Sequence, residues 1–244
     1  MACTPPVPPR PEGEERRLQA LSRYCVPGAA PEPAFGRIAN LARAVFDTPA
    51  AMVSVVDETR QWFQARQGFE AAETPRDWAF CAYTILSDEP LVVPDTLRDP
   101  LFAQNPLVTG GPRIRFYAGA PITTRDGLRL GSVCVASPRP RTSVPHRDDL
   151  ARLADLAAIA MDQLEMRLRA RALAQALAER DAALARALGR EPGGDIFIHG
   201  RGPEGNRFAQ SNRDWTAGCI AVKDEEIEEV YAMLRPGVPI VINP

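Results

Sequence analysis

The sequence predicts an α+β protein in which an antiparallel sheet with flanking helices precedes a long coiled-coil-like helix and a short, mostly β C-terminal segment. Three observations predict this class. Up to residue 144, β-branched runs alternate with helical stretches and turn residues. Residues 145–190 are almost all Ala, Leu, Arg, Asp, Glu and Gln, and glycines and a proline at 189–194 then stop that helix before the composition changes. The expected divisions are a Pro-rich tail and helix start at 1–19, an α+β unit at 20–144, the long helix at 145–190 and a C-terminal segment at 191–244.

Composition and charge exclude several classes of protein. Of the 244 residues, 45% are hydrophobic and 25% are charged, which is typical of a globular chain with one or two domains. The 29 Lys and Arg nearly balance the 31 Asp and Glu, so no basic field favours nucleic acid. No apolar run approaches the roughly 18 residues of a membrane span, and the Pro-rich start lacks the apolar stretch of a secretory signal. We therefore expect a cytoplasmic protein without a membrane span.

The cysteines do not form a metal-binding pattern. No two of the five are spaced as a Cys-x-x-Cys pair, so we expect no metal site and no cofactor. Their scattered, odd-numbered distribution also argues against a disulfide framework, and most are expected to be small buried hydrophobes. They are Cys3, Cys25, Cys81, Cys134 and Cys219.

Three helices are expected before residue 90. The first spans residues 14–24, with apolar contacts from Leu18, Leu21 and Tyr24. The second follows Pro31, where apolar residues recur every three or four positions and define one buried stripe, made of Phe35, Ile38, Leu41, Ala42 and Val45. The third is expected at 76–86.

The sheet is expected to contain five strands. Their β-branched and apolar runs lie at residues 51–57, 62–66, 91–94, 114–122 and 128–136. Asp126-Gly127, between the last two runs, is a strong hairpin signal. Residues 96–112 are rich in proline and glycine, which predicts a loop.

This order of elements and several short stretches resemble a GAF domain, a module that senses small molecules or signals. The resemblance covers about residues 20–166 and is carried by 52–57, 61–68, Phe80-Cys81, 87–95, 114–121 and 131–135. It implies a pocket between the sheet and the loop at 96–112, filled by a small ligand whose identity it leaves open. Bilin attachment would need a reactive cysteine, whereas Cys81 and Cys134 are expected in the core.

The long helix has the spacing of a coiled-coil seam in its first part. Its apolar residues step by three and four, through Leu150, Leu153, Ala157, Ala160 and Leu164. Beyond Leu164 the steps become four or five, which shifts the seam, through Leu168, Leu173 and Leu177 to Leu184 and Leu188. Two interpretations stay open: the stripe joins two copies into a homodimer, or its first part packs on the sheet and the rest is a solvated spacer. His146, at the helix start, is expected to cap the helix or lie on the surface.

Two residues of the last fifty have the types that cysteine acyl transfer requires. His199 ends a short strand expected at 195–200, and Cys219 follows 20 positions later, directly after Gly218. A cysteine nucleophile needs a base to form its thiolate. A preceding glycine lets a carbonyl substrate approach backbone N–H groups that face the oxyanion. A buried cysteine and a hydrogen-bonded histidine without a catalytic role are the alternative interpretation. A helix at 224–234 and a strand at 238–242 are expected to follow.

This segment is similar to the C-terminal part of the L,D-transpeptidase (YkuD-type) catalytic domain. The similarity is carried by Ile198-His199-Gly200 and by Thr216-Ala217-Gly218-Cys219-Ile220. It implies that Cys219 is the nucleophile, that His199 is the proton donor and acceptor, and that the Gly218 backbone lies near the oxyanion. The Cys219 thiolate would attack the carbonyl of a peptidoglycan stem peptide, and an amine of a second stem would resolve the thioester. The family often has histidine where this chain has Ala217.

Two functions follow from these resemblances. One is L,D-transpeptidase-like acyl transfer on peptidoglycan, coupled to a GAF sensory domain; such an enzyme would have to work in the periplasm or cell wall. The other is a non-enzymatic, dimeric GAF sensor with an inactive transpeptidase remnant, favoured because the strands that precede the histidine in the family are missing. A gene fusion or a reading-frame error near Gly189 would also produce such a join.

Overall fold

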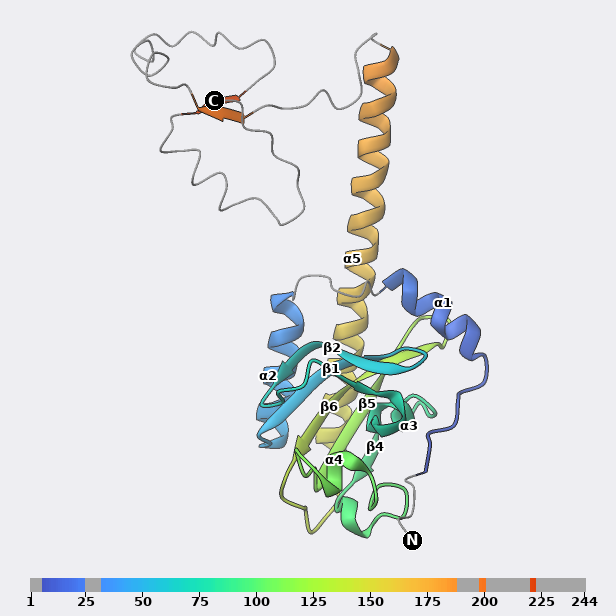
Figure 1. The fold of residues 1–244 in the computed structure, drawn as a ribbon, viewed down its shortest axis with the longest axis vertical. Coiled ribbons are helices and arrows are strands. Elements are labelled where there is room, and N and C mark those ends of the chain that lie inside the picture. The colour runs from blue at the N-terminus through green and yellow to red at the C-terminus, as the bar shows by residue number, and fades with distance from the viewer. Residues whose placement is uncertain (1–5, 25–31, 188–197, 201–219, 223–244) are drawn as a thin grey trace. The chain divides into compact units, whose positions relative to one another are not determined.

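The computed structural model describes residues 6–24, 32–187, 198–200 and 220–222. The chain divides into two compact units, Met1–Ala172 and Leu173–Pro244. The first unit contains a six-stranded sheet in the order β3-β2-β1-β6-β5-β4, with every neighbouring pair antiparallel (Figure 1). The predicted α+β class with an antiparallel sheet and a long helix is confirmed.

The strands lie close to their expected positions. They are β1 (Ala50–Val56), β2 (Arg60–Gln67), β3 (Glu73–Pro75), β4 (Leu91–Val93), β5 (Phe116–Thr123) and β6 (Arg129–Ser137). Sequence patterns missed β3 because three residues are too few to show an alternation. The hairpin between β5 and β6 turns at Gly127, whose φ of 82° suits a residue without a Cβ.

The helices differ more from expectation. They are α1 (Glu14–Tyr24), α2 (Pro33–Phe46), α3 (Phe80–Thr84), α4 (Pro106–Thr109) and α5 (Arg147–Ala187), with 3-10 turns η1 (Arg76–Trp78) and η2 (Thr96–Arg98). The helix expected at 76–86 is broken at Ala79, which adopts an extended backbone. The expected loop at 96–112 contains η2 and α4, both capped by side chains: Asp95 accepts from the Leu97 N–H, and Asn105 from the Leu107 N–H.

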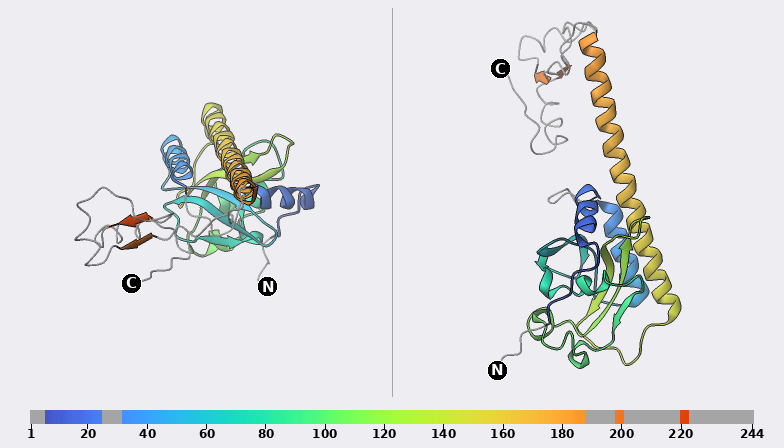
Figure 2. Two further views of the ribbon diagram at one scale, coloured as in Figure 1. Left: turned by 90° about the horizontal axis from the view of Figure 1, so that it is seen from above. Right: turned by 90° about the vertical axis from the view of Figure 1, so that its right-hand side faces the viewer.

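The central strands separate two cores. Successive side chains of a strand point to opposite faces, and every residue of β1 is buried. Ala51, Val53 and Val55 join a first core with α1, α2 and α5, whereas Met52 and Val56 join a second core with α3 and α4. Seen from above, α2 and α5 lie on one side of the sheet (Figure 2). The sheet is therefore the middle layer of three.

The first part of α5 belongs to this unit. Its buried residues include most of the seam expected from the sequence, namely Leu153, Ala157, Ala160 and Leu164, and Leu150 is partly buried beside them. The seam therefore packs on the chain's own sheet, as the second interpretation of the long helix proposed for this part. The first compact unit accordingly reaches Ala172, beyond the end of the α+β unit expected at 20–144.

One expected core residue of α2 is exposed. Leu41 is 55% exposed, and Ala39 and Phe46 are buried instead. The buried side of α2 is centred between Phe35 and Ala42, and Leu41 lies about 120° around the helix from that centre. The three-and-four spacing predicts Leu41 in the buried stripe, because this spacing does not distinguish two neighbouring faces of a helix.

His146 caps α5, as expected. Its backbone carbonyl accepts hydrogen bonds from the N–H groups of Asp149 and Leu150, at 3.0 and 3.2 Å. Its Nδ1 accepts from the Asp148 N–H at 3.3 Å. The side-chain contact satisfies the Asp148 N–H, one of the groups that the first turn of a helix leaves without an intrahelical partner.

A buried ion network fixes α1 to the sheet. Arg17 is 1% exposed, and its guanidinium donates to the Val56 carbonyl at 2.6 Å and to the Glu14 carboxylate at 2.6 and 2.9 Å. Arg76 of η1 also pairs with Glu14 and donates to the Asp57 carbonyl at 2.7 Å. Burial alone would raise the pKa of Glu14, but the two guanidiniums hold it below its usual value.

We expect Arg17→Ala to lower the free energy of unfolding of the first unit by about 3–5 kcal/mol, because it leaves a buried carboxylate with only one of its two partners. Arg16→Ala, an exposed change on the same helix, should stay within about 0.5 kcal/mol. Urea unfolding followed by circular dichroism measures both. Equal midpoints for the two variants would show that the network is not structural.

Candidate functional site

The second unit brings the strand of His199 beside the strand that begins after Cys219. His199 lies in β7 (Ile198–Gly200), which pairs in parallel with β8 (Ile220–Val222), and His199 is opposite Ala221. Adjacent strands of a sheet lie about 4.8 Å apart. Cys219 and Gly218 lie outside the described residues, but Cys219 is bonded directly to Ile220, where β8 begins.

The helix at 224–234 and the strand at 238–242 lie outside the described residues, as does the beginning of the strand expected at 195–200. Among the described helices, none is long and apolar enough to cross a bilayer.

In the first unit, six buried side chains form a polar group on the sheet face beneath α3. We call this group the thiol–hydroxyl cluster; it consists of Ser54, Cys81, Thr84, Tyr117, Ser132 and Cys134. Cys81 and Thr84 come from α3, and the other four come from β1, β5 and β6. The two-residue period of the strands places those four on one face.

The members of the cluster contact one another directly. The Cys81 and Cys134 Sγ atoms are 3.7 Å apart, and the Tyr117 hydroxyl donates to Cys81 Sγ at 3.4 Å. The Tyr117 and Thr84 hydroxyls are hydrogen-bonded at 2.8 Å, and the Ser54 and Ser132 hydroxyls at 3.3 Å. Both cysteines are free thiols.

These contacts make the two thiols unequal. Burial alone would raise the pKa of Cys81, but hydrogen bonds from Cys134, Ser132, Ser54 and Tyr117 lower it. The hydrogen bond with Cys81, together with burial, raises the pKa of Cys134. Burial, together with the neighbouring sulfurs, also raises the pKa of Tyr117. The hydrogen bonds therefore shift the pKa values of the two thiols in opposite directions, downward for Cys81 and upward for Cys134.

An aromatic layer covers this cluster. Phe80 of α3 stacks on Phe102 at a centroid distance of 4.3 Å, and Leu107 and Val108 of α4 are buried in the same core. These side chains lie between the sheet and the backbone of residues 96–112, where the GAF resemblance implies a ligand pocket. A ligand entering here would have to displace them.

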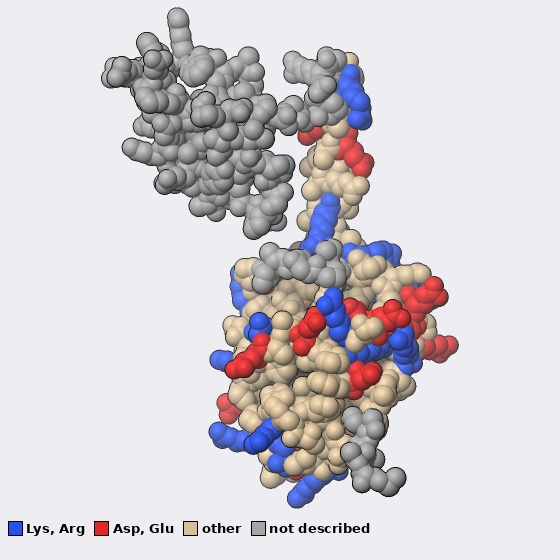
Figure 3. Space-filling view, in the orientation of Figure 1, with Lys and Arg blue, Asp and Glu red and all other residues tan. Residues whose placement is uncertain are grey.

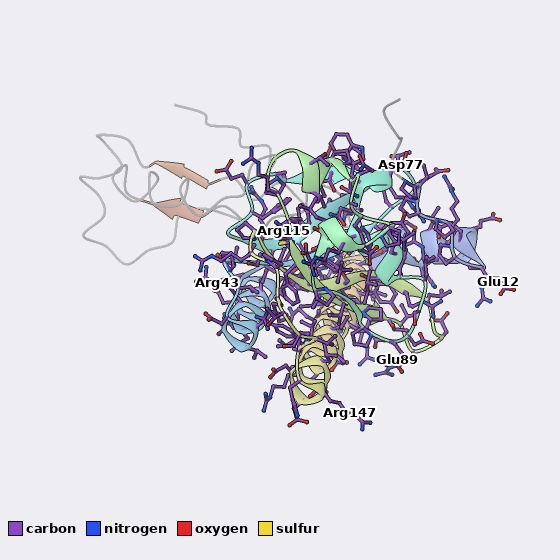
Figure 4. All side chains as sticks on the ribbon, turned by 90° about the horizontal axis from the view of Figure 1, so that it is seen from below. Glu12, Arg43, Asp77, Glu89, Arg115 and Arg147 are labelled. Atoms are coloured by element: carbon purple, nitrogen blue, oxygen red, sulfur yellow. The ribbon has the colours of Figure 1, made fainter. Side chains whose placement is uncertain are left out.

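An open hollow of about 970 Å³ lies at a different place. It is lined by the end of α2 and by the segment after β6, including Arg43, Asp47, Arg139 and Arg141. Figure 4 labels Arg43 on α2. Arg141 is held there by the Phe46 carbonyl, and its guanidinium lies 4.5 Å from the ring centroid of Phe116.

Charges of both signs are intermixed on the visible face of the first unit (Figure 3). Arg115, labelled in Figure 4, forms two hydrogen bonds from one guanidinium nitrogen to Asp95, at 2.8 and 3.0 Å. This ion pair joins the segment before η2 to the start of β5. The segment at 96–112 is therefore fixed to the sheet at its first end.

Sequence reasoning placed Cys81 and Cys134 in the core but missed the rest of the cluster. A signal was present: Ser54, Tyr117 and Ser132 share one phase of the alternation in their strands, opposite the purely apolar phase. The contribution of Thr84 could not be seen, because its neighbours come from strands far away in the sequence.

The fold and this covered sheet face define a small α+β domain built on a central antiparallel sheet. A family model described as GAF domain matches residues 30–163, and the chain belongs to the GAF domain family. A second model, described as the L,D-transpeptidase catalytic domain, matches residues 133–242. Residues 133–163 are common to both matches and include the end of β6 and the start of α5, which contribute to the core of the first unit. The strands β7 and β8 fall in the region matched by the transpeptidase model alone.

A curated relative shares part of this sequence. The chain is 43% identical over 142 residues to a cyclic di-GMP phosphodiesterase of Pseudomonas aeruginosa; the match covers 58% of this chain and 24% of the relative. This chain thus spans about a quarter of the relative's length.

Solved GAF domains have similar folds at low identity. One is the Thermosynechococcus elongatus PixJ GAF domain in its blue-light absorbing form, at 14% identity and a TM-score of 0.48, covering 67% of this chain and 94% of that one. Another is the GAF domain from Acinetobacter phosphoenolpyruvate-protein phosphotransferase, at 14% identity and a TM-score of 0.47, covering 62% and 90%. Identities this low concern the fold alone.

Gly119 makes room for the Tyr117 hydroxyl, because a Cβ at position 119 would overlap the phenol. We expect Gly119→Ala to destabilise the first unit by about 1–3 kcal/mol through overpacking. Gly36→Ala, in α2 with open space around it, should instead stabilise it by about 1 kcal/mol through helix propensity. Thermal unfolding distinguishes these opposite signs, and a neutral or stabilising Gly119→Ala would refute the close packing around Tyr117.

Proposed function

We propose that the chain acts as a GAF sensory module that dimerises through α5. The observation that carries this proposal is a second apolar stripe on α5, distinct from the buried seam. Its members are 43–62% exposed: Ile159, Met166, Leu173, Leu177 and Leu184. At 3.6 residues per turn they fall within an arc of about 40°.

The spacing of this stripe fits a helix pair. Its steps are seven, seven, four and seven residues, which is typical of positions that face a partner helix in a coiled coil. Exposed apolar side chains aligned over this length favour association, because burying each one against a partner removes apolar surface from water. A second copy of the chain presents the same stripe and satisfies this requirement by symmetry.

The sheet provides a route from a signal to α5. The thiol–hydroxyl cluster lies on one sheet face, and the buried seam of α5 packs on the other. A small molecule that displaced the aromatic layer would shift β5 and β6. This shift would change how the buried seam of α5 packs on the sheet. The relative from Pseudomonas aeruginosa supports a modular role, since the shared segment is only part of a much longer enzyme.

Charged substitutions in the stripe test the dimer. We expect Met166→Glu and Leu173→Glu each to weaken dimerisation by about 100-fold, because each places a carboxylate in the centre of an apolar interface. Ala178→Glu is the matched control, being exposed on another face of the same helix. Light scattering after size exclusion measures the mass, and circular dichroism checks the helix content. A wild-type chain that stays monomeric at high concentration would refute the proposal.

A second candidate function is L,D-transpeptidase-type acyl transfer by the C-terminal segment. The specific observation in its favour is the β7–β8 register, which sets His199 opposite Ala221, two residues after Cys219. Cys219 would attack the carbonyl of a peptidoglycan stem peptide, with His199 as base for the thiol and then as acid for the leaving amine. The Gly218 backbone would lie near the oxyanion.

A carbapenem tests this second function, since it acylates a reactive cysteine of this type irreversibly enough for mass spectrometry. We expect one adduct on the full chain, lost in Cys219→Ala and strongly slowed in His199→Ala, because the thiolate loses its base. Cys25→Ala should keep the adduct. An adduct that survives in Cys219→Ala, or none on folded wild type, would contradict the assignment.

A further inference from the structure

We propose that Cys81 and Cys134 form a redox-active dithiol, which a small hydroperoxide oxidises to a disulfide inside the first unit. This goes beyond the sensor and acyl-transfer functions and depends on neither. The placement carries it: thiols from α3 and β6, 53 positions apart, meet at an Sγ–Sγ distance of 3.7 Å.

The geometry requires only a small movement. A disulfide has an S–S distance of about 2.05 Å, so the sulfurs must approach by about 1.6 Å. Cys134 is held in the middle of the sheet, opposite Met52 of β1 and Gly119 of β5. Cys81 is on the five-residue α3, which is preceded by an extended residue and followed by a turn. The two sulfurs would therefore approach each other by rotation of the cysteine side chains and by movement of α3.

The surroundings of Cys81 suit a nucleophilic thiolate. The titratable groups that face it are Tyr117 from β5 and Cys134 from β6, and both donate hydrogen bonds when neutral. The hydroxyls of Ser54 of β1 and Ser132 of β6 also lower the pKa of Cys81, and they are hydrogen-bonded to each other at 3.3 Å. Gly119 keeps the Tyr117 hydroxyl in place, since any side chain there would displace it. Hydrogen bonds to the charged form are what lowers a thiol pKa and raises the thiolate fraction.

The reaction balances in two steps. The Cys81 thiolate attacks one peroxide oxygen, forming an S–O bond and breaking O–O; the leaving hydroxide takes a proton and departs as water. The Cys134 sulfur then attacks the Cys81 sulfenic acid, forming S–S and breaking S–O, while its proton joins the leaving hydroxide as a second water. Two thiols lose two electrons in total, and hydrogen peroxide is reduced to two waters.

The burial of both sulfurs limits the size of the oxidant that can reach them. Cys81 is 1% exposed and Cys134 is not exposed. A bulky disulfide such as oxidised glutathione cannot reach either sulfur without unfolding, whereas hydrogen peroxide is close to water in size. The site therefore fits a hydroperoxide of minimal size.

Oxidation would change the packing of the aromatic layer that covers the thiol–hydroxyl cluster. Phe80 precedes Cys81 and stacks on Phe102, and Tyr83 meets the same ring edge-on at a centroid distance of 5.0 Å. A shift of α3 toward β6 moves both contacts of Phe102. The packing of residues 96–112 is thus mechanically coupled to the redox state of the pair.

Peptide mapping tests the disulfide on the full chain. The native protein is treated with hydrogen peroxide, alkylated in denaturant and digested with trypsin. We expect one cross-linked pair, residues 77–98 with 130–141, which dithiothreitol separates. Cys81→Ser and Cys134→Ser should each lose it, and the chain oxidised in denaturant should give mixed pairings among its five cysteines. Oxidation only at other cysteines, or sulfinic acid at Cys81 without a cross-link, would overturn the proposal.

The pH dependence of the cross-linking rate distinguishes a thiolate role of Cys81 from a role in packing alone. The rate of cross-linking should rise with pH and level off once Cys81 is a thiolate. Tyr117→Phe removes one donor, so the levelling-off should move to higher pH. At pH values below this plateau, the rate should fall by about threefold for each unit by which the pKa of Cys81 rises. The thiolate fraction falls more steeply than this, but a more basic thiolate is also more nucleophilic, which offsets part of the loss. An unchanged profile in folded Tyr117→Phe would overturn the role of Cys81 as the attacking thiolate.

Discussion

The first unit depends on a sheet whose central strands are buried on both faces. Because β1 and β6 alternate between two cores, each face needs its own cover, and the chain supplies α1, α2 and α5 for one face and α3 with α4 for the other. The buried Arg17–Glu14–Arg76 network belongs to the same requirement, since it attaches α1 at the end of β1, where the Val56 and Asp57 carbonyls need donors.

The two faces are chemically different, and this difference gives the module its potential for function. The side chains of β1, β5 and β6 that face α2 and α5 are mostly apolar, and on that side the buried Arg167 of α5 donates to Gln64 of β2. The face under α3 instead holds thiols and hydroxyls that are hydrogen-bonded to one another. A buried polar group of this kind specifies one arrangement of side chains and responds sharply when one partner changes. The helix α5 has a corresponding double role: one side completes the apolar core, and the other leaves an apolar stripe exposed.

The C-terminal segment carries the second family match. Its described backbone is limited to β7 and β8, and their parallel register relates His199 to the strand that begins after Cys219. Its match to the transpeptidase family overlaps the GAF match over β6 and the start of α5, where the structure builds the GAF core. Only residues 164–242, beyond that overlap, are therefore matched by the transpeptidase model alone.

The sequence by itself determined the fold class, five of the six strands of the first sheet, the long helix and both family resemblances, because alternation, helical periodicity and turn residues are local. It also identified His199 and Cys219 as a candidate pair and placed Cys81 and Cys134 in the core. Only the tertiary structure decided that the first seam of α5 packs on its own sheet, that Leu41 is exposed and that Cys81 meets Cys134 beside Tyr117. These depend on which surfaces far apart in the sequence come together, and no local pattern encodes that choice: an apolar stripe fits its own sheet and a second chain equally well until the sheet is assembled.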